Sequence, residues 1–212
     1  MTVEEPGEMV EIAPGAVWFP SYLDRATQEA LRDAIRDVVR QAPLYTPAMP
    51  RSGEPLSVRM TNCGSLGWVS DVSGYRYQST HPETGTTWPP MPDILLTAWR
   101  LLAQYPHPPE ACLVNFYHAA AKLGLHQDRD EDNFDAPVLS LSLGDTARFR
   151  IGGAERGGKT ASVELKSGDA FIFGGPSRLA YHGVDRIYPD TSTLLRDGGR
   201  INLTMRRVTK PK

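Results

Sequence analysis

His126 and Asp128 stand two positions apart in the chain and could bind a metal ion together. On an extended segment, side chains two positions apart point to the same face, so an imidazole and a carboxylate would project into one space. Facial non-haem iron sites use two imidazoles and one carboxylate on one side of Fe(II), which leaves the opposite side open. His182 follows several strand-like segments that could bring the chain back to the same place. The candidate iron ligands are therefore His126, Asp128 and His182.

The pair alone is weak evidence, because a histidine and an aspartate separated by one residue also occur by chance. The alternative is an ordinary surface histidine at the solvated end of a strand. The choice between the two depends on which elements the rest of the chain would place around the pair.

Length and composition favour one β-rich domain. The chain has 212 residues, of which 40% are hydrophobic and 23% charged, which is ordinary for a globular protein with one substantial core. Its 18 prolines and 19 glycines are spread along the chain, as expected for short strands separated by many turns. We expect residues 1–14 to form a polar arm and the whole chain to form a single domain.

Charge and cysteine content restrict the partners and the compartment. A net charge of −2 gives no general attraction to nucleic acid, so any contact with DNA would depend on local basic residues. Cys63 and Cys112 form no C-x-x-C motif, which argues against a zinc cluster or a disulfide scaffold. No apolar segment has the length of a membrane span, and the acidic residues 1–5 lack the basic region of a signal peptide. We expect a cytoplasmic protein with no membrane association.

Two amphipathic helices are predicted, and each needs a sheet to cover. The first spans residues 24–41, with Asp24 as its N-cap and Pro43 beyond its end. The second spans residues 93–105 and ends before Pro106. Neither helix has residues suited to catalysis.

From residue 111 onward the sequence predicts a succession of short strands separated by turn residues. They cover residues 112–117, 125–128, 138–143, 148–151, 162–165, 169–173, 180–184 and 200–206. This pattern favours two packed sheets of a jelly roll, whose open end could bring distant residues together. The predicted fold class is α+β and β-rich, with a double-stranded β-helix core at residues 111–207.

The last predicted strand alternates polar and apolar side chains. The polar residues that would share one face are Arg200, Asn202, Thr204 and Arg206. Asn115 and Tyr117 repeat this pattern on another strand. Burying two guanidinium groups is costly unless an anion binds them, and the alternative is a solvated outer face with the aliphatic residues inside. Because the candidate iron ligands indicate a 2-oxoglutarate oxygenase, we expect the inward arrangement, with a dicarboxylate bound beside the iron.

Residues 45–90 form a segment rich in Gly, Ser and Thr that also contains aromatic residues and arginines. Predicted strands at residues 57–61 and 74–78 indicate a small β-structured lid. Trp68, Tyr75, Arg76 and Tyr77 are the residue types that a base-stacking surface requires. The alternative is that these aromatic residues attach a loop to the core.

Taken together, these motifs resemble the AlkB family of Fe(II)- and 2-oxoglutarate-dependent dioxygenases. The resemblance covers nearly the whole chain from about Ala16 onward, and the segments that carry it are residues 60–68, 74–77, 111–117, 122–131, 181–183 and 200–206. It departs from the bacterial pattern at Phe116 and at residues 118–120, after the asparagine, and in the length of the loop at residues 46–55.

The resemblance implies a role for each matching residue. Iron would be bound by His126, Asp128 and His182, and 2-oxoglutarate by Asn115, Tyr117, Arg200, Asn202 and Arg206. A flipped methylated base would lie between Trp68 and His126. Further substrate contacts would come from Tyr75, Arg76, Tyr77, Asp130 and Arg156.

The implied activity is oxidative demethylation of N1-methyladenine and N3-methylcytosine in DNA. It consumes O₂ and 2-oxoglutarate and releases succinate, CO₂ and formaldehyde. The expected partner is alkylated DNA, preferably single-stranded, with RNA as a further substrate, and the expected state is a monomer. Two alternatives remain open: a related dioxygenase acting on methylated RNA, a protein side chain or a small molecule, and a catalytically silent jelly-roll binding module.

Overall fold

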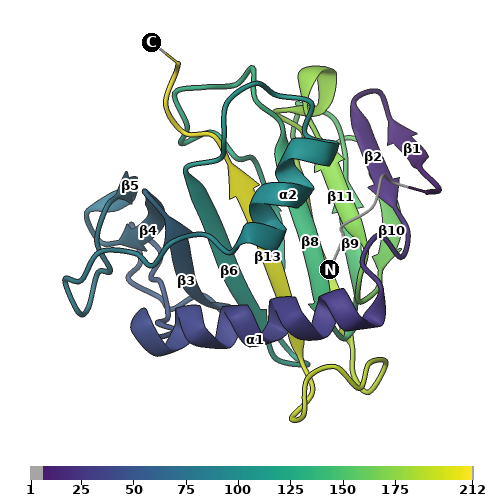
Figure 1. Ribbon diagram of the computed structural model, residues 1–212. Helices are drawn as coiled ribbons and strands as arrows, with labels where there is room; N and C mark the ends of the chain where they lie inside the picture. Colours follow the sequence, from purple (N-terminus) through teal and green to yellow (C-terminus); the bar gives the residue numbers. More distant parts are fainter. Residues whose placement is uncertain (1–6, 212) are drawn as a thin grey trace.

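The computed structural model describes residues 7–211, which form a jelly roll of two packed sheets (Figure 1). The major sheet has seven strands in the order β1-β2-β11-β8-β13-β6-β3, and the minor sheet has four in the order β10-β9-β12-β7. The major-sheet strands are β1 Val10–Ala13, β2 Ala16–Phe19, β3 Arg59–Gly64, β6 Ala111–Tyr117, β8 Val138–Gly144, β11 Ala170–Phe173 and β13 Arg200–Arg206. The minor-sheet strands are β7 Leu123–His126, β9 Thr146–Ile151, β10 Ala161–Leu165 and β12 His182–Tyr188. The predicted fold class is confirmed.

Two helices cover the outer face of the major sheet (Figure 1). Helix α1 spans Arg25–Gln41, and the side chain of Asp24 accepts a hydrogen bond from the backbone N–H of Thr27 at 2.7 Å, which confirms the predicted N-cap. Helix α2 spans Asp93–Leu102 and ends three residues before the predicted end at residue 105. Within residues 7–211, neither helix is long and apolar enough to cross a membrane.

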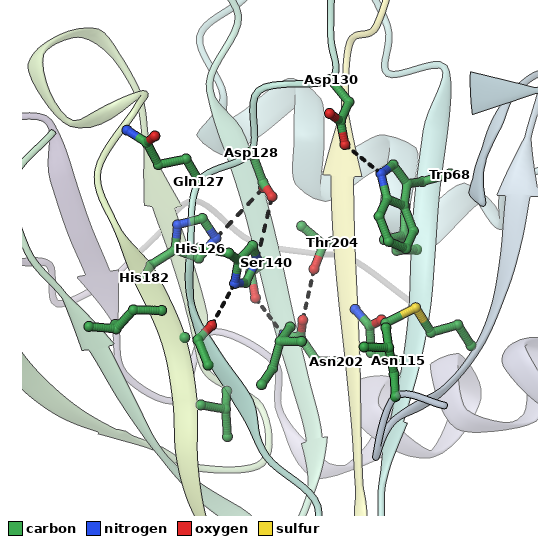
Figure 2. A pocket seen from close by; sticks show the side chains of 18 of the residues that line it. Trp68, Asn115, His126, Gln127, Asp128, Asp130, Ser140, His182, Asn202 and Thr204 are labelled. Carbon is green, nitrogen blue, oxygen red and sulfur yellow. Dashed lines mark hydrogen bonds and ion pairs between the residues drawn. The ribbon is translucent and has the colours of Figure 1, made fainter. Parts of the chain in front are cut away.

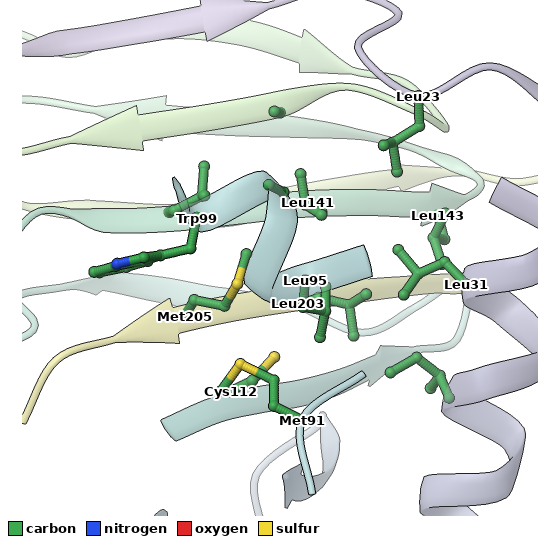
Figure 3. Packing of buried hydrophobic residues seen from close by; sticks show 14 of the residues in the cluster. Leu23, Leu31, Met91, Leu95, Trp99, Cys112, Leu141, Leu143, Leu203 and Met205 are labelled. Carbon is green, nitrogen blue, oxygen red and sulfur yellow. The ribbon is translucent and has the colours of Figure 1, made fainter. Parts of the chain in front are cut away.

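The main core lies between these helices and the major sheet. Leu95 and Trp99 of α2 pack in this cluster with Leu203 and Met205 of β13 and Leu141 of β8 (Figure 3). All five side chains are almost fully buried. Because alternate residues of a strand face opposite sides, packing the aliphatic residues of β13 against the helices turns its polar residues toward the minor sheet. The predicted orientation of the last strand is confirmed.

The second core cluster lies between the two sheets. It contains Phe171 and Phe173 of the major sheet together with Phe149 and Val184 of the minor sheet. Phe149, Phe173 and Val184 also line the cavity between the sheets, so apolar packing borders the polar side chains described below.

All eight strands predicted after residue 111 are present, with ends shifted by a few residues. The N-terminal segment differs from its prediction. Residues 1–6 of the predicted arm lie outside the described residues, but Val10–Ala13 forms β1 and pairs with β2. The reason is that Ile12 and Ala13 pack against the core between the sheets. The polar-arm prediction is therefore wrong for these four residues.

The predicted lid also differs in part. Strand β3 belongs to the major sheet, where it pairs with β6 and buries Met60 and Cys63, so this part of residues 45–90 is core structure. The hairpin outside the main sheets consists of β4 Gly67–Asp71 and β5 Gly74–Gln78. Strand β4, which carries Trp68, had not been predicted.

Replacing Leu203 by alanine tests the core assignment. Leu203 is fully buried between the sheet and the helices, so the truncation is expected to lower the free energy of unfolding by about 2–5 kcal/mol, measured by urea denaturation. Val72→Ala is the control, because Val72 is 73% exposed at the turn of the β4–β5 hairpin, and a change within about 0.5 kcal/mol is expected. Similar losses in both variants would contradict the assignment.

Candidate active site

A cavity of about 470 Å³ opens between the two sheets, next to the β4–β5 hairpin. Eleven of the residues predicted to bind iron, 2-oxoglutarate or substrate line it: Trp68, Tyr75, Asn115, Tyr117, His126, Asp128, Asp130, His182, Arg200, Asn202 and Arg206. Three predicted substrate contacts do not line it: Arg76, Tyr77 and Arg156. The fold thus brings together residues that are more than 130 positions apart in the chain.

The three candidate iron ligands meet in this cavity (Figure 2). His126 is the last residue of β7 and His182 the first residue of β12, and the two are direct partners in the antiparallel pairing of these strands. Asp128 lies just after the end of β7, so the predicted strand at residues 125–128 was wrong in its bounds. The carboxylate nevertheless approaches both imidazoles, with Nε2 of His126 at 3.7 Å from Oδ1 and Nε2 of His182 at 3.8 Å from Oδ2.

Backbone hydrogen bonds set the tautomer of both imidazole rings. Nδ1 of His126 lies 2.9 Å from the carbonyl oxygen of Gly124, and Nδ1 of His182 lies 2.9 Å from that of Ala180. Because a carbonyl oxygen can only accept, each Nδ1 carries a proton, and in the neutral ring Nε2 then has the free lone pair. Burial also lowers the pKa of His182 to about 4, which favours the neutral ring. Both Nε2 atoms can therefore bind a metal.

Asp128 forms a buried ion pair with Arg206. Nε and Nη2 of Arg206 donate to Oδ2 of Asp128 at 2.9 and 2.6 Å, and both residues are buried. Burial is the largest single influence and would raise the pKa of Asp128, but the charge and hydrogen bonds of Arg206, together with His182 and His126, outweigh it and keep that pKa below its usual range. Asp128 is therefore ionised and can bind a cation. The contact also shows that Arg206, which was predicted to bind 2-oxoglutarate, pairs with a candidate metal ligand.

Arg200 is a buried cation with neutral partners. It is 1% exposed, and it donates to the carbonyl of Leu165 at 3.2 Å and to the hydroxyl of Ser142 at 2.9 Å. Its Nε has no hydrogen-bond partner among the described residues. Burial lowers the pKa of Arg200 to about 10, which leaves it charged at neutral pH. Because an uncompensated buried charge is costly, this side chain fits the carboxylate of a small anionic molecule such as 2-oxoglutarate.

Neighbouring polar groups lie on the same wall of the cavity. Asn202 donates to the hydroxyl of Ser140 at 2.6 Å and accepts from the hydroxyl of Thr204 at 2.7 Å (Figure 2). Oδ1 of Asn115 is buried without a partner among the described residues, and Tyr117 lines the cavity beside it. An unpaired amide and an unpaired guanidinium nitrogen on adjacent strands are what a bound polar molecule would satisfy.

The β4–β5 hairpin contributes aromatic side chains to the mouth of the cavity. The rings of Trp68 and Tyr75 are stacked, with centroids 5.5 Å apart and planes at 19°. The indole Nε1 of Trp68 donates to Oδ2 of Asp130 at 2.8 Å (Figure 2). An aromatic surface and a carboxylate therefore lie together at the entrance.

The other predicted substrate residues lie elsewhere. Arg76 is on the opposite face of the hairpin and pairs with Asp71 at 2.8 Å. The hydroxyl of Tyr77 donates to the buried carboxylate of Glu131. Arg156 is exposed on the loop between β9 and β10.

Sequence reasoning missed Glu131, Arg178 and Ser140. Ser140 could have been found, because Ser140 and Ser142 alternate with leucines along β8 and must share the polar face. Arg178 follows a Gly-Pro turn and shows no comparable signal. Its burial, at 3% exposure, follows from tertiary contacts alone.

Comparison with known proteins identifies the family. A family model described as the 2OG-Fe(II) oxygenase superfamily matches residues 15–206. An alpha-ketoglutarate-dependent dioxygenase AlkB homolog of Caulobacter vibrioides is 53% identical over 197 residues, which are 93% of this chain and 89% of that protein. The chain belongs to the AlkB family. It is therefore a dioxygenase that depends on Fe(II), 2-oxoglutarate and O₂.

Two further comparisons agree with membership of the AlkB family. The alpha-ketoglutarate-dependent dioxygenase AlkB of Escherichia coli is 40% identical over 203 residues, covering 94% of this chain and 93% of that protein. The solved structure of OsALKBH1 has a TM-score of 0.80 and 35% identity, and the match covers 94% of this chain and 100% of that one. The AlkB-family fold thus extends over nearly all of the chain.

Binding of 2-oxoglutarate at Arg200 can be tested through stability. With Mn²⁺ present, a hundredfold excess over Kd adds about 2.7 kcal/mol to the folded state, which raises the Tm of a protein of this size by roughly 5–10 °C. Arg200→Met is expected to lose most of this rise, because the charge-assisted contact is removed. Arg207→Met is the matched control, since Arg207 contacts Glu110 and backbone carbonyls away from the cavity. An undiminished rise in Arg200→Met would argue against this binding mode.

Proposed function

We propose that this AlkB-family enzyme removes methyl groups from alkylated bases of nucleic acid by oxidation, with N1-methyladenine and N3-methylcytosine in DNA as substrates. The observation that supports this most is the arrangement at the cavity mouth, where Trp68 and Asp130 are hydrogen-bonded at 2.8 Å above the His126, Asp128 and His182 cluster. An aromatic face and a carboxylate suit a flat cationic base, because both attract positive charge. Base alkylation at these nitrogens produces such a cation.

We assign the iron to Nε2 of His126, Nε2 of His182 and the carboxylate of Asp128. This assignment is supported by the two backbone carbonyls that direct the imidazole lone pairs toward Asp128. Arg206 orients the carboxylate by two hydrogen bonds. When bound, iron supplies the oxidation of the methyl carbon by O₂, coupled to conversion of 2-oxoglutarate to succinate and CO₂. The hydroxymethyl group then leaves as formaldehyde.

We assign 2-oxoglutarate to the polar wall formed by β6 and β13. Arg200 is deep in the cavity and would pair with the carboxylate far from the iron, in a charge-assisted contact. Asn115, Tyr117 and Asn202 would bind along the rest of the molecule. Arg206 would contribute by fixing Asp128 and by placing positive charge beside the carboxylate that faces the metal.

The base must leave its stack to reach the iron, since a methyl group inside a duplex is not accessible. The flipped base would stack on Trp68 with His126 on its other side, and Tyr75 extends the aromatic surface outward. Arg76, Tyr77 and Arg156 do not line the cavity. Any contact they make with substrate would therefore be with the nucleic-acid strand outside the cavity. Extrusion costs least in a single strand, and we therefore propose single-stranded DNA as the preferred substrate.

We also propose that the chain works as a monomer and as a single domain in the cytoplasm. In this domain the segment 45–90 contacts substrate through its β4–β5 hairpin and residues 111–207 bind iron and 2-oxoglutarate. Met49 supports a substrate role for the loop at residues 46–55, because it lines the cavity and is 41% exposed.

A turnover assay tests the activity. With Fe(II), 2-oxoglutarate, O₂ and a single-stranded oligonucleotide carrying N1-methyladenine, the oligonucleotide is expected to lose one methyl mass for each formaldehyde released. Asp128→Asn should lower turnover at least about 100-fold, because losing a metal ligand costs more than losing an outer partner. The asparagine keeps the size of the side chain, and Glu131 remains 3.4 Å from Arg206 as a charge partner. Succinate without demethylation would refute the substrate assignment and direct the search to RNA, protein or small molecules. Full activity in Asp128→Asn would refute the metal assignment.

Replacing Trp68 tests base stacking. Trp68→Ala is expected to raise the KM for the methylated oligonucleotide by roughly 5- to 150-fold, which corresponds to a stacking energy of about 1–3 kcal/mol. Uncoupled decarboxylation of 2-oxoglutarate should continue, because the Trp68 side chain hydrogen-bonds Asp130 and none of the three proposed iron ligands. Trp68→Phe is the matched variant that retains an aromatic face but cannot donate to Asp130. Its KM should lie between the KM of the wild type and that of Trp68→Ala. An unchanged KM in Trp68→Ala would contradict the stacking role.

A further inference from the structure

Arg178 is a buried arginine that joins two segments of the active site. It is 3% exposed and stands four positions before His182, directly after the short 3-10 turn Gly175–Ser177. Its guanidinium donates from Nη1 to the backbone carbonyl of Asp128 at 2.8 Å and from Nε to the carbonyl of Ala136 at 2.9 Å. One side chain from the segment leading to His182 therefore holds both ends of the loop that begins with Asp128.

The third bond of Arg178 goes to a carboxylate inside the same loop. Nη2 donates to Oε2 of Glu131 at 3.0 Å, and the Glu131 side chain is 1% exposed. The guanidinium also lies over the ring of Phe134, 5.3 Å from its centroid. The loop at residues 128–136 is thus fixed to Arg178 through its backbone, an acidic side chain and an aromatic ring.

Glu131 connects this arrangement back to the carboxylate of Asp128. Its Oε1 accepts from the hydroxyl of Tyr77 on β5 and lies 3.4 Å from Nε of Arg206. Arg206 in turn donates to Oδ2 of Asp128. The contacts close a ring in which Arg178 holds the backbone of Asp128 and Arg206 holds its side chain, with Glu131 between the two arginines.

We propose that Arg178 is a positioning residue for the metal centre, which fixes Asp128 relative to His182 through the backbone of residue 128. The inference rests on the proposed function, since it assumes that these residues bind iron. Asp128 lies beyond the end of β7, so no strand pairing determines where its backbone stands. Arg178 fixes the backbone of Asp128 instead, and it belongs to the chain segment that leads to His182, the other buried candidate ligand.

The arrangement of acceptors around residue 178 requires the planar guanidinium of arginine, and a positive charge alone would not be enough. Three acceptors from Asp128, Ala136 and Glu131 surround one planar group, and a guanidinium has donors fixed in that plane. A lysine ammonium is a single point on a flexible stem and cannot reach all three. Arg178→Lys therefore keeps the charge beside Glu131 while loosening Asp128.

Titration of metal-free protein with Co²⁺ by calorimetry tests the proposal without turnover, because Co²⁺ stands next to Fe²⁺ in the affinity order of divalent metals. Arg178→Lys is expected to bind Co²⁺ roughly 10- to 100-fold more weakly than the wild type, the usual effect of removing an outer partner of a metal ligand. Arg207→Lys is the matched control, because Arg207 also bonds a backbone carbonyl and a glutamate but lies away from the cavity. It should bind Co²⁺ like the wild type.

Melting temperatures recorded on the same samples separate positioning from general support of the fold. A lower Tm with unchanged Co²⁺ affinity in Arg178→Lys would overturn the proposal, since a purely structural arginine would give that result. If Arg178→Lys does not fold, Glu131→Gln replaces it, because the amide leaves Arg178 with neutral acceptors only; a loss of roughly two- to tenfold is then expected, and an unchanged affinity overturns the proposal. Failure of the wild type to bind Co²⁺ would overturn the proposed iron site as well, which distinguishes the two failures.

Discussion

The buried ion pair between Arg206 and Asp128 is the interaction on which the active site depends. Both groups are charged and hidden from water, and either one alone would destabilise the fold strongly. Asp128 comes from a loop beyond a strand of the minor sheet, whereas Arg206 comes from the last strand of the major sheet. The pair therefore joins the two sheets at the point where the cavity opens, and it keeps the Asp128 carboxylate ionised for a metal.

Strand β13 shows why the cavity can be polar inside a stable domain. Leu203 and Met205 are fully buried against the helices, and this apolar face anchors the strand in the core. The opposite face is then free to carry Arg200, Asn202 and Arg206 into the space between the sheets. Its neighbours β6 and β8 supply Asn115, which pairs with Asn202, and Ser140, which pairs with Thr204. Packing on one side of the strand thus supports binding chemistry on the other.

The iron and 2-oxoglutarate residues predicted from sequence patterns depend on strand periodicity, whereas Trp68 and Asp130 were predicted from the resemblance to the AlkB family. The inward face of β13, the matching face of β6 and the positions of His126 and His182 next to strands follow from a repeat of two residues. Arg178 and Glu131 could not be found in this way, because they lie in loops and their burial depends on contacts between distant segments. The same limit explains why Asp128 was placed inside a strand, and why β3 was assigned to the lid although it pairs with β6.

Charge balance in the cavity explains why metal and cosubstrate would support each other. Arg206 is matched by Asp128 and Arg178 by Glu131, whereas the carboxylate partner of Arg200 is missing among the described residues. A divalent metal alone would add positive charge beside Arg206. The metal and Arg206 would then both depend on the single negative charge of Asp128. A dicarboxylate would compensate both the metal and Arg200 in one step, because it carries one negative charge at each end. With the proposed assignments, the charges of the site would be balanced best with both bound, which would favour binding of the metal and of 2-oxoglutarate together over either one alone.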